Sequence, residues 1–265
     1  MKKIVHISDL HFGTEDLNLV RELLENINNH NPNLVIISGD LTQRAKSEQY
    51  EAAADFLAQI KFPKIVVPGN HDISLWNLFR RFFNPLHRFK KYIHDDEFPF
   101  YEDNEITIVG INSARSLTIM DGRISLRQIQ HLKNIFCNKS EPQFKAIVVH
   151  HNLIPSTDIK SHKILGRAGL MIAELNKCGI DMIFSGHLHK YHSEDVQKYF
   201  KGSNSIIISQ AGTATSSRIR GEKNSYNYVE VFPSKMVINI MRFNGEKFIA
   251  EKEIIYNREQ NYSTS

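Results

Sequence analysis

The chain has 265 residues, 41% of them apolar and 23% charged. This composition is typical of a globular protein that can bury a sizeable core without disulfide bonds or structural metals to stabilise it. Its net charge of +4 is compatible with an anionic substrate, but it is too small to indicate a nucleic-acid polymer as partner. No apolar run approaches the ~18 residues of a membrane span, and the first candidate ligand comes as early as Asp9. We therefore expect a cytoplasmic protein.

Short apolar runs alternate with helical patterns along most of the chain. Strands are predicted at residues 4–7, 34–37, 64–67, 106–111, 144–149 and 181–184. Helical spacing predicts helices around 20–27, 50–57, 129–135 and 170–178, and Ser125 and Gln128 form a capping box before the third. Beyond residue 205 only strands are predicted, at 228–231, 236–243 and 248–256. This order favours packed α/β layers over one doubly wound sheet.

The domain organisation follows from length and composition. We expect a single domain over residues 1–256 and a polar, frayed tail over 257–265. The two cysteines, Cys137 and Cys178, lie far apart and have no zinc-site spacing. They lie on helical patterns, so we expect two small buried apolar groups and no disulfide.

Five of the predicted strands share one feature, because each is followed by a polar cluster. The clusters are Ser8–His11, Gly39–Asp40, Gly69–Asp72, His150–His151 and Gly186–His189. Strand carboxyl ends are where open α/β sheets bind ligands. One such cluster is typical of an ordinary turn, but clusters after five of the first six strands predict a shared site.

The residue types in these clusters indicate metal binding. Carboxylate, imidazole and amide oxygen suit divalent Mn, Fe or Zn, and a carboxylate can bridge two cations. Two metals about 3.5–4 Å apart can activate a water and clamp both oxygens of an in-line displacement. Gly39, Gly69 and Gly186 directly precede candidate ligands, where glycine permits positive φ and close backbone approach.

The order D-x-H, G-D, G-N-H-D, a strand-terminal His and G-H-x-H resembles the calcineurin-like metallophosphoesterase superfamily from Asp9 to His189. The region around Gly212 and the overall length resemble its class III cyclic nucleotide phosphodiesterase branch. Asn152 and Leu153 depart from that branch, which often has two prolines there. The resemblance implies an α/β fold, a four-layer α/β/β/α sandwich of two mixed sheets flanked by helices.

The resemblance also implies a ligand set for two divalent metal ions, Mn, Fe or Zn. The first metal would be held by Asp9, His11 and His189, the second by Asn70, His150 and His187, and Asp40 would bridge both.

Three further residues receive roles beside the metals. His71 would act on the substrate phosphate or the leaving oxygen, oriented by Asp72. Of the adjacent pair His150 and His151, the family pattern favours His150 as the ligand. His151 is left as a substrate contact or a turn residue.

Basic and aromatic residues interleave from Trp76 to Ile93 on predicted helices broken near Pro85. One interpretation is a helical pair whose aromatic residues pack on the body. The other is a cap in which Arg80 and Arg81 bind an anionic substrate, with weak contact to a membrane surface as a variation.

The leading functional hypothesis is a phosphodiesterase that hydrolyses a small anionic phosphate ester with a metal-activated water. A pyrophosphate or nucleotide-sugar hydrolase of lipid metabolism is the second, because the same metals cleave phosphoanhydrides. A non-catalytic scaffold is the third, but it predicts lost ligands, and every expected position is filled. The sequence leaves the natural substrate, the metal and a homodimer open.

Overall fold

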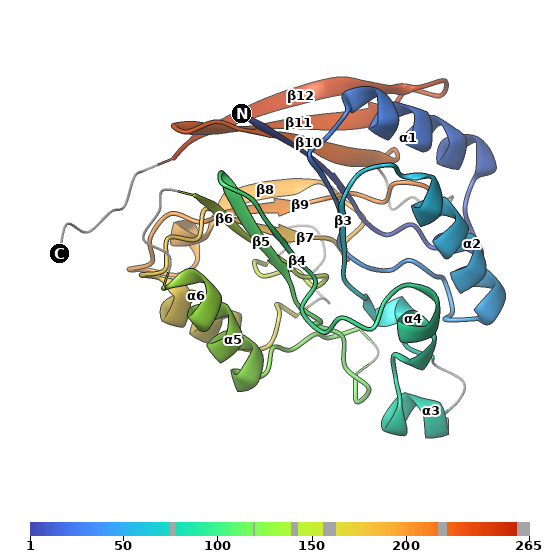
Figure 1. Ribbon diagram of the computed structural model, residues 1–265, viewed down its shortest axis with the longest axis horizontal. Coiled ribbons are helices and arrows are strands. Elements are labelled where there is room, and N and C mark those ends of the chain that lie inside the picture. Colours follow the sequence, from blue (N-terminus) through green and yellow to red (C-terminus); the bar gives the residue numbers. More distant parts are fainter. Residues whose placement is uncertain (75–77, 119, 139–142, 156–162, 217–221, 259–265) are drawn as a thin grey trace.

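The computed structural model describes residues 1–74, 78–118, 120–138, 143–155, 163–216 and 222–258. Two six-stranded mixed sheets pack together, with helices on their outer faces (Figure 1). Among these residues, no helix is both long and apolar enough to span a bilayer.

The first sheet has the order β12-β11-β10-β1-β2-β3. Its strands are β1 (Lys2–Ile7), β2 (Leu34–Ile37), β3 (Lys64–Val66), β10 (Ser225–Val231), β11 (Lys235–Phe243) and β12 (Phe248–Asn257). β1, β2 and β3 run parallel, while β10, β11 and β12 form an antiparallel meander that pairs with β1. The strands predicted after residue 205 therefore complete the sheet that the first three strands begin.

The second sheet has the order β4-β5-β6-β7-β9-β8. Its strands are β4 (Phe100–Glu102), β5 (Ile106–Gly110), β6 (Phe144–Val148), β7 (Met182–Ser185), β8 (His192–Asp195) and β9 (Ile207–Gln210). β5, β6, β7 and β9 are parallel, and β4 and β8 are antiparallel edges. The short polar edge strand β8 was not predicted, because it has no apolar pattern.

The helices cover the outer face of each sheet. The helices are α1 (Leu17–His30), α2 (Ser47–Gln59), α3 (Leu78–Phe83), α4 (His87–Tyr92), α5 (Leu126–Phe136) and α6 (Ala168–Leu175), with single 3₁₀ turns η1 (Asn70–Asp72) and η2 (Val196–Lys198). α1 and α2 lie against the first sheet, α5 and α6 lie against the second, and α3 projects at the end of the molecule (Figure 1). The predicted capping box begins α5, where the Ser125 hydroxyl accepts from the Gln128 amide.

Three apolar cores confirm the four layers. Alternate residues of each strand point to opposite faces, so Ile4 packs between the sheets while Val5 packs under the helices. One core lies between the first sheet and α1 and α2, one between the two sheets, and one between the second sheet and α5 and α6. The predicted α/β/β/α sandwich is therefore confirmed.

The cysteines differ from the prediction. Cys137, the exposed residue that ends α5, and the buried Cys178 beyond α6 form a disulfide, with their Cα atoms 4.2 Å apart. The expectation of two unpaired, buried cysteines was wrong, because packing of α5 beside α6 joins positions 41 residues apart.

The expected tail also begins later than predicted. Asn257 is the last residue of β12, and the Arg258 guanidinium lies 2.8 Å from the Asp181 carboxylate. Residues 259–265, the rest of that tail, lie outside the described residues.

Candidate metal centre

The polar clusters meet at the carboxyl ends of β1, β2 and β3 in one sheet and of β6 and β7 in the other. The site therefore lies where parallel strands of two packed sheets end side by side. Two groups of buried ligand atoms form there and share one carboxylate, Asp40.

The first group contains Asp9, His11, Asp40 and His189. The Nε2 atoms of His11 and His189 are 3.0 Å apart, and His189 Nε2 lies 3.2 Å from Asp9 Oδ1. His11 Nε2 lies 3.9 Å from Asp40 Oδ2. The four side chains predicted around the first metal thus point their ligand atoms at one another.

The second group contains Asp40, His150 and His187, and Asn70 joins it. His150 Nε2 lies 3.3 Å from Asp40 Oδ2, 3.1 Å from Asn70 Oδ1 and 3.3 Å from His187 Nδ1. The structure therefore places His150, rather than its neighbour, among these ligand atoms.

The residues present fit two divalent cations. Ligands about 2.0–2.2 Å from a metal lie roughly 3.0–3.5 Å from one another when they bind at adjacent positions, which matches most of these separations. Asp9 Oδ1 is buried and accepts no hydrogen bond. A buried, unpaired carboxylate oxygen is costly unless a cation compensates it.

Each aspartate uses its two oxygens differently. Asp9 Oδ2 accepts the His187 amide at 3.0 Å, and Asp40 Oδ1 accepts the His71 amide at 2.9 Å. The other oxygen of each carboxylate faces the ligand groups. The backbone thus fixes both carboxylates before any cation binds.

The backbone also selects the binding nitrogen of His150. Its Nδ1 lies 2.8 Å from the Ser38 main-chain oxygen, so this nitrogen donates a hydrogen bond. The lone pair of the neutral ring is then on Nε2, which faces Asp40 and Asn70. Sequence reasoning missed Ser38, because it acts through its carbonyl.

Most of the ligands lie in left-handed backbone. The φ values are +54° for Asp9, +51° for His11, +53° for Asp40, +77° for His187 and +59° for His189. Non-glycine residues rarely adopt this region, and Asp, Asn and His tolerate it best. The turns after β1, β2 and β7 therefore bend at the ligands themselves, and this strain is concentrated at the site.

The two predicted roles of glycine, positive φ and close backbone approach, fall at different positions. Gly39 has a φ of +96°, as expected. Gly69 and Gly186 do not have positive φ and are needed for space. A Cβ on Gly69 would lie 2.8 Å from Asp40 Cγ, and one on Gly186 would lie 2.7 Å from Asp9 Oδ2.

Without cations, the site balances its charge with protons. Burial alone would raise the pKa of Asp40, but the nearby His150 and His71 lower it well below its usual range. Burial would lower the pKa of His150, but the Asp40 carboxylate raises it to about 9. Metal binding at this pair must displace a proton, so metal affinity falls as pH falls.

His71 lies beside the first ligand group. Its ring centroid is 4.8 Å from that of His11, and its Nδ1 lies 2.9 Å from the Gln43 main-chain oxygen. The expectation that Asp72 orients this ring is not what the structure shows. Asp72 instead accepts the amides of Leu41, Thr42 and Gly69, and so ties the turns after β2 and β3 together. Gln43 carries no motif that sequence reasoning could have detected.

His151 is fully buried beside the second group. Its Nδ1 lies 2.7 Å from the Ser113 hydroxyl, and its ring lies 4.7 Å from the His187 ring. Gly122 packs directly on the ring, because a Cβ there would lie 2.8 Å from its Cδ2 atom. His151 thus connects the metal centre to the loop between β5 and α5.

Arg81 points into the protein. It is buried, and its guanidinium donates to the carbonyls of Ser116 at 2.7 Å and Thr118 at 2.6 Å. These bonds hold the β5–α5 loop against α3. Trp76 and the side chain of Arg80 lie outside the described residues.

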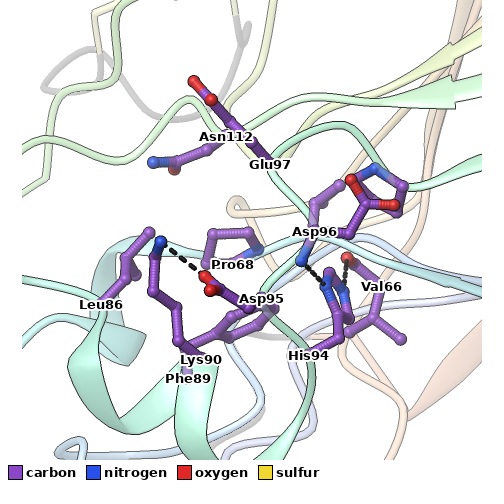
Figure 2. A pocket seen from close by; sticks show the side chains of 12 residues that line it. Val66, Pro68, Leu86, Phe89, Lys90, His94, Asp95, Asp96, Glu97 and Asn112 are labelled. Carbon is purple, nitrogen blue, oxygen red and sulfur yellow. Dashed lines mark hydrogen bonds and ion pairs between the residues drawn. The ribbon is translucent and has the colours of Figure 1, made fainter.

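Parts of α4, the second helix of the basic, aromatic segment, also contact the body, whereas Phe82 and Phe83 on α3 are exposed. Arg88 donates to the Ala45 carbonyl at 2.6 Å, and Lys90 lies 2.6 Å from Asp95. Figure 2 shows Lys90 and the buried Phe89 lining a small pocket with Val66 and Pro68. These contacts favour the interpretation that this helical pair packs on the body.

Comparison with known proteins agrees with this geometry. Residues 2–191 match the family model described as calcineurin-like phosphoesterase. The glycerophosphodiester phosphodiesterase GpdQ of Enterobacter lignolyticus is 30% identical over 26% of this chain and 29% of its own length. A probable cyclic nucleotide phosphodiesterase of Vesicomyosocius okutanii is 23% identical over 71% of this chain and 78% of its own. The first of these alignments therefore spans less than a third of the relative.

Solved structures share the fold. A purple acid phosphatase from yellow lupin, Lupinus luteus, aligns with a TM-score of 0.69 and 12% identity over 98% of this chain and 54% of its own. A dimetal phosphatase from Danio rerio aligns with a TM-score of 0.69 and 12% identity, covering 97% of this chain and 99% of its own. With the family model matching from β1 through the final ligand, His189, the chain belongs to the calcineurin-like phosphoesterase family.

Proposed function

We propose that the chain is a phosphodiesterase that hydrolyses a small phosphate ester. The observation that carries the proposal is the pair of buried ligand groups that share Asp40. Two divalent cations bound there would supply an activated water and neutralise charge on the phosphoryl oxygens. The described ligands do not distinguish Mn, Fe and Zn.

The protein holds this site in place before substrate arrives. The amides of His71 and His187 fix the bridging and terminal carboxylates, and the Ser38 carbonyl fixes His150. Such preorganisation means that little reorganisation is needed during the reaction.

His71 is proposed as the residue that protonates the leaving group. Its Nδ1 hydrogen is donated to the Gln43 carbonyl, which leaves Nε2 as the nitrogen that can exchange a proton. In the charged ring, Nε2 would donate that proton to the leaving oxygen. The Gln43 carbonyl accepts from Nδ1 in both forms, so the ring keeps its orientation through the cycle.

The choice of phosphodiesters rests on the relatives. One is named a glycerophosphodiester phosphodiesterase and another a probable cyclic nucleotide phosphodiesterase. A substrate panel tests the proposal, with bis(p-nitrophenyl) phosphate, p-nitrophenyl phosphate, cyclic nucleotides and UDP-sugars offered to protein loaded with Mn, Fe or Zn.

We expect the diesters to be turned over fastest, and Asp40→Asn to abolish that turnover. Preference for UDP-sugars would instead indicate an anhydride hydrolase. Absence of turnover with every loaded metal would support a scaffold and reject the proposal.

A further inference from the structure

Three arginines, Arg115, Arg123 and Arg167, lie close together and are called here the arginine triad. Arg115 and Arg123 lie on the loop after β5, and Arg167 ends the connection between β6 and α6. Both connections leave carboxyl ends of parallel strands, at the edge of the second sheet that carries His150 and His187. The triad is therefore on the edge where this fold binds ligands.

Main-chain bonds hold the two connections together. The Gly166 amide donates to the Gly122 carbonyl at 2.9 Å, and the Ile124 amide donates to the Gly166 carbonyl at 3.1 Å. Two side chains of the triad add to this pairing. Arg115 Nε donates to the Arg123 carbonyl at 2.9 Å, and Arg167 Nη1 donates to the Ile124 carbonyl at 3.1 Å.

A short chain of contacts links the triad to the metal ligands. Arg123 directly follows Gly122, whose backbone packs on the His151 ring. That ring in turn lies 4.7 Å from the ring of the ligand His187. The His151 ring therefore lies between Gly122, the residue before Arg123, and the His187 ring of the second ligand group.

No carboxylate in the described part of the chain neutralises the positive charge of the triad. Among the described residues, no carboxylate forms an ion pair with any of the three guanidinium groups, and the nearby Asp121 lies 3.4 Å from Lys163 instead. Burial, followed by the charges of Arg123 and Arg167, lowers the pKa of Arg115. α6 starts directly after Arg167 with no side-chain cap, so its first amides add positive potential.

Of the three guanidinium groups, that of Arg123 is the most accessible to a ligand. It is exposed, and no described group accepts a hydrogen bond from it. Arg115 and Arg167 each use one donor on a carbonyl, which fixes their direction, and among the described residues nothing accepts from their other donors. Planar guanidinium donors pair best with phosphate or carboxylate oxygens.

We propose that the arginine triad binds a phosphate monoester group that the substrate carries in addition to the phosphate hydrolysed at the metal centre. This inference rests on the proposed function and narrows it to small phosphodiesters with a second phosphate. The metal centre would bind the phosphate that is hydrolysed, and the arginine triad would bind the second phosphate of the same substrate.

A matched pair of chromogenic substrates tests the proposal. Thymidine 5′-(p-nitrophenyl phosphate) and its 3′-phosphorylated form differ only in the second phosphate. For the metal-loaded wild-type protein, we expect KM to be at least about tenfold lower for the 3′-phosphorylated substrate, as one charged hydrogen-bonding pair provides. Equal KM values for the two substrates would overturn the proposal.

Single variants assign the effect to the triad. Arg123→Gln should bring the ratio of the two KM values close to one, while Arg123→Lys keeps part of it. Arg21→Gln, on the outer helix α1, is the charge-matched control and should keep the full ratio. The triad would be refuted as the binding site of the second phosphate if two variants kept the wild-type ratio of KM values. These are Arg123→Gln and the correctly folded double variant Arg115→Gln/Arg167→Gln.

A binding experiment separates this proposal from the proposed activity. Thymidine 3′,5′-bisphosphate and thymidine 5′-monophosphate are titrated calorimetrically into the metal-loaded wild-type protein and into Arg123→Gln. Tighter binding of the bisphosphate to the wild type alone supports the triad even if no ester is hydrolysed, in which case only the proposed function fails. Equal affinities for the wild type overturn the triad whether or not the protein is an enzyme.

Discussion

The Nδ1 atom of His71 lies 2.9 Å from the main-chain oxygen of Gln43, so a carbonyl, which cannot titrate, orients this ring. A carboxylate partner would have stabilised the charged ring and made proton release harder. The carbonyl fixes the direction of the ring.

His71→Ala should slow hydrolysis of alkyl phosphodiesters by about 10²–10⁴-fold, because the leaving alkoxide would no longer receive a proton. Nitrophenyl esters should lose less, since nitrophenolate leaves without one. Steady-state rates on both ester classes check this, with metal content measured to show that the ligands are intact. Gln43→Ala is the control, because it keeps the carbonyl. Equal losses on both ester classes would mean that His71 only positions the phosphate.

Asp40→Asn should reduce binding of both cations, because its Oδ2 is the ligand atom that both groups share. Asp9→Asn should reduce binding at the first group alone, since Asp9 is absent from the second. Metal analysis after dialysis against a chelator and reloading gives the stoichiometry of each variant. The same occupancy in the two variants would contradict a bridging role for Asp40.

Arg81→Met should lower the free energy of unfolding by about 1.5–3 kcal/mol, because the partly buried carbonyls of Ser116 and Thr118 lose a charged donor. Urea denaturation measures this loss, and hydrogen exchange should rise in the loop that contains both residues. Arg127→Met is the control, since its side chain is 74% exposed and its ion pair with Glu97 lies on the surface. If stability and exchange are unchanged while KM rises, Arg81 is a substrate contact, as the sequence first suggested.

In the folded protein, His6 should remain neutral at pH values well below the usual pKa of a histidine. Burial, only partly opposed by Asp9, lowers its pKa from 6.5 to about 3. The unfolded chain binds the proton from pH 6.5 downward while the folded chain does not, so stability is lost as pH falls from 6.5 towards 3. NMR titration should show no protonation of His6 above pH 4. The pH slope of unfolding should be shallower in His6→Gln, and an unchanged slope would assign the acid sensitivity to other groups.

Much of the site could be predicted, because its signals are local. A polar cluster after an apolar strand can be read from a few residues, and Asp9, Asp40 and the pair of His150 and His151 were singled out in this way. The choice of His150 within that pair came from the resemblance to the family. The strands bring them together because parallel strands present their carboxyl ends at one edge. The alternation of strands and helices predicted packed α/β layers, and the four-layer order came from the resemblance to the family.

The remaining features depend on long-range packing. The carbonyls of Ser38 and Gln43 orient His150 and His71, and every residue has a carbonyl, so no residue type marks them. The disulfide depends on how α5 lies beside α6. The role of Arg81 follows from the approach of a loop more than 30 residues away, as shown by its bond to Ser116 at a separation of 35.

The left-handed backbone at Asp9 and Asp40 restricts which residues can replace these ligands in this chain. Asparagine adopts the conformations of Asp9 and Asp40 readily and nearly preserves their shape, but it lacks their charge. A single Asp→Asn replacement could therefore silence catalysis while the turn keeps its form. A duplicated copy of this chain would need one such substitution to change from a hydrolase into a binding protein with little metal. An Asn at the position of Asp9 or Asp40 would identify such a copy from its sequence.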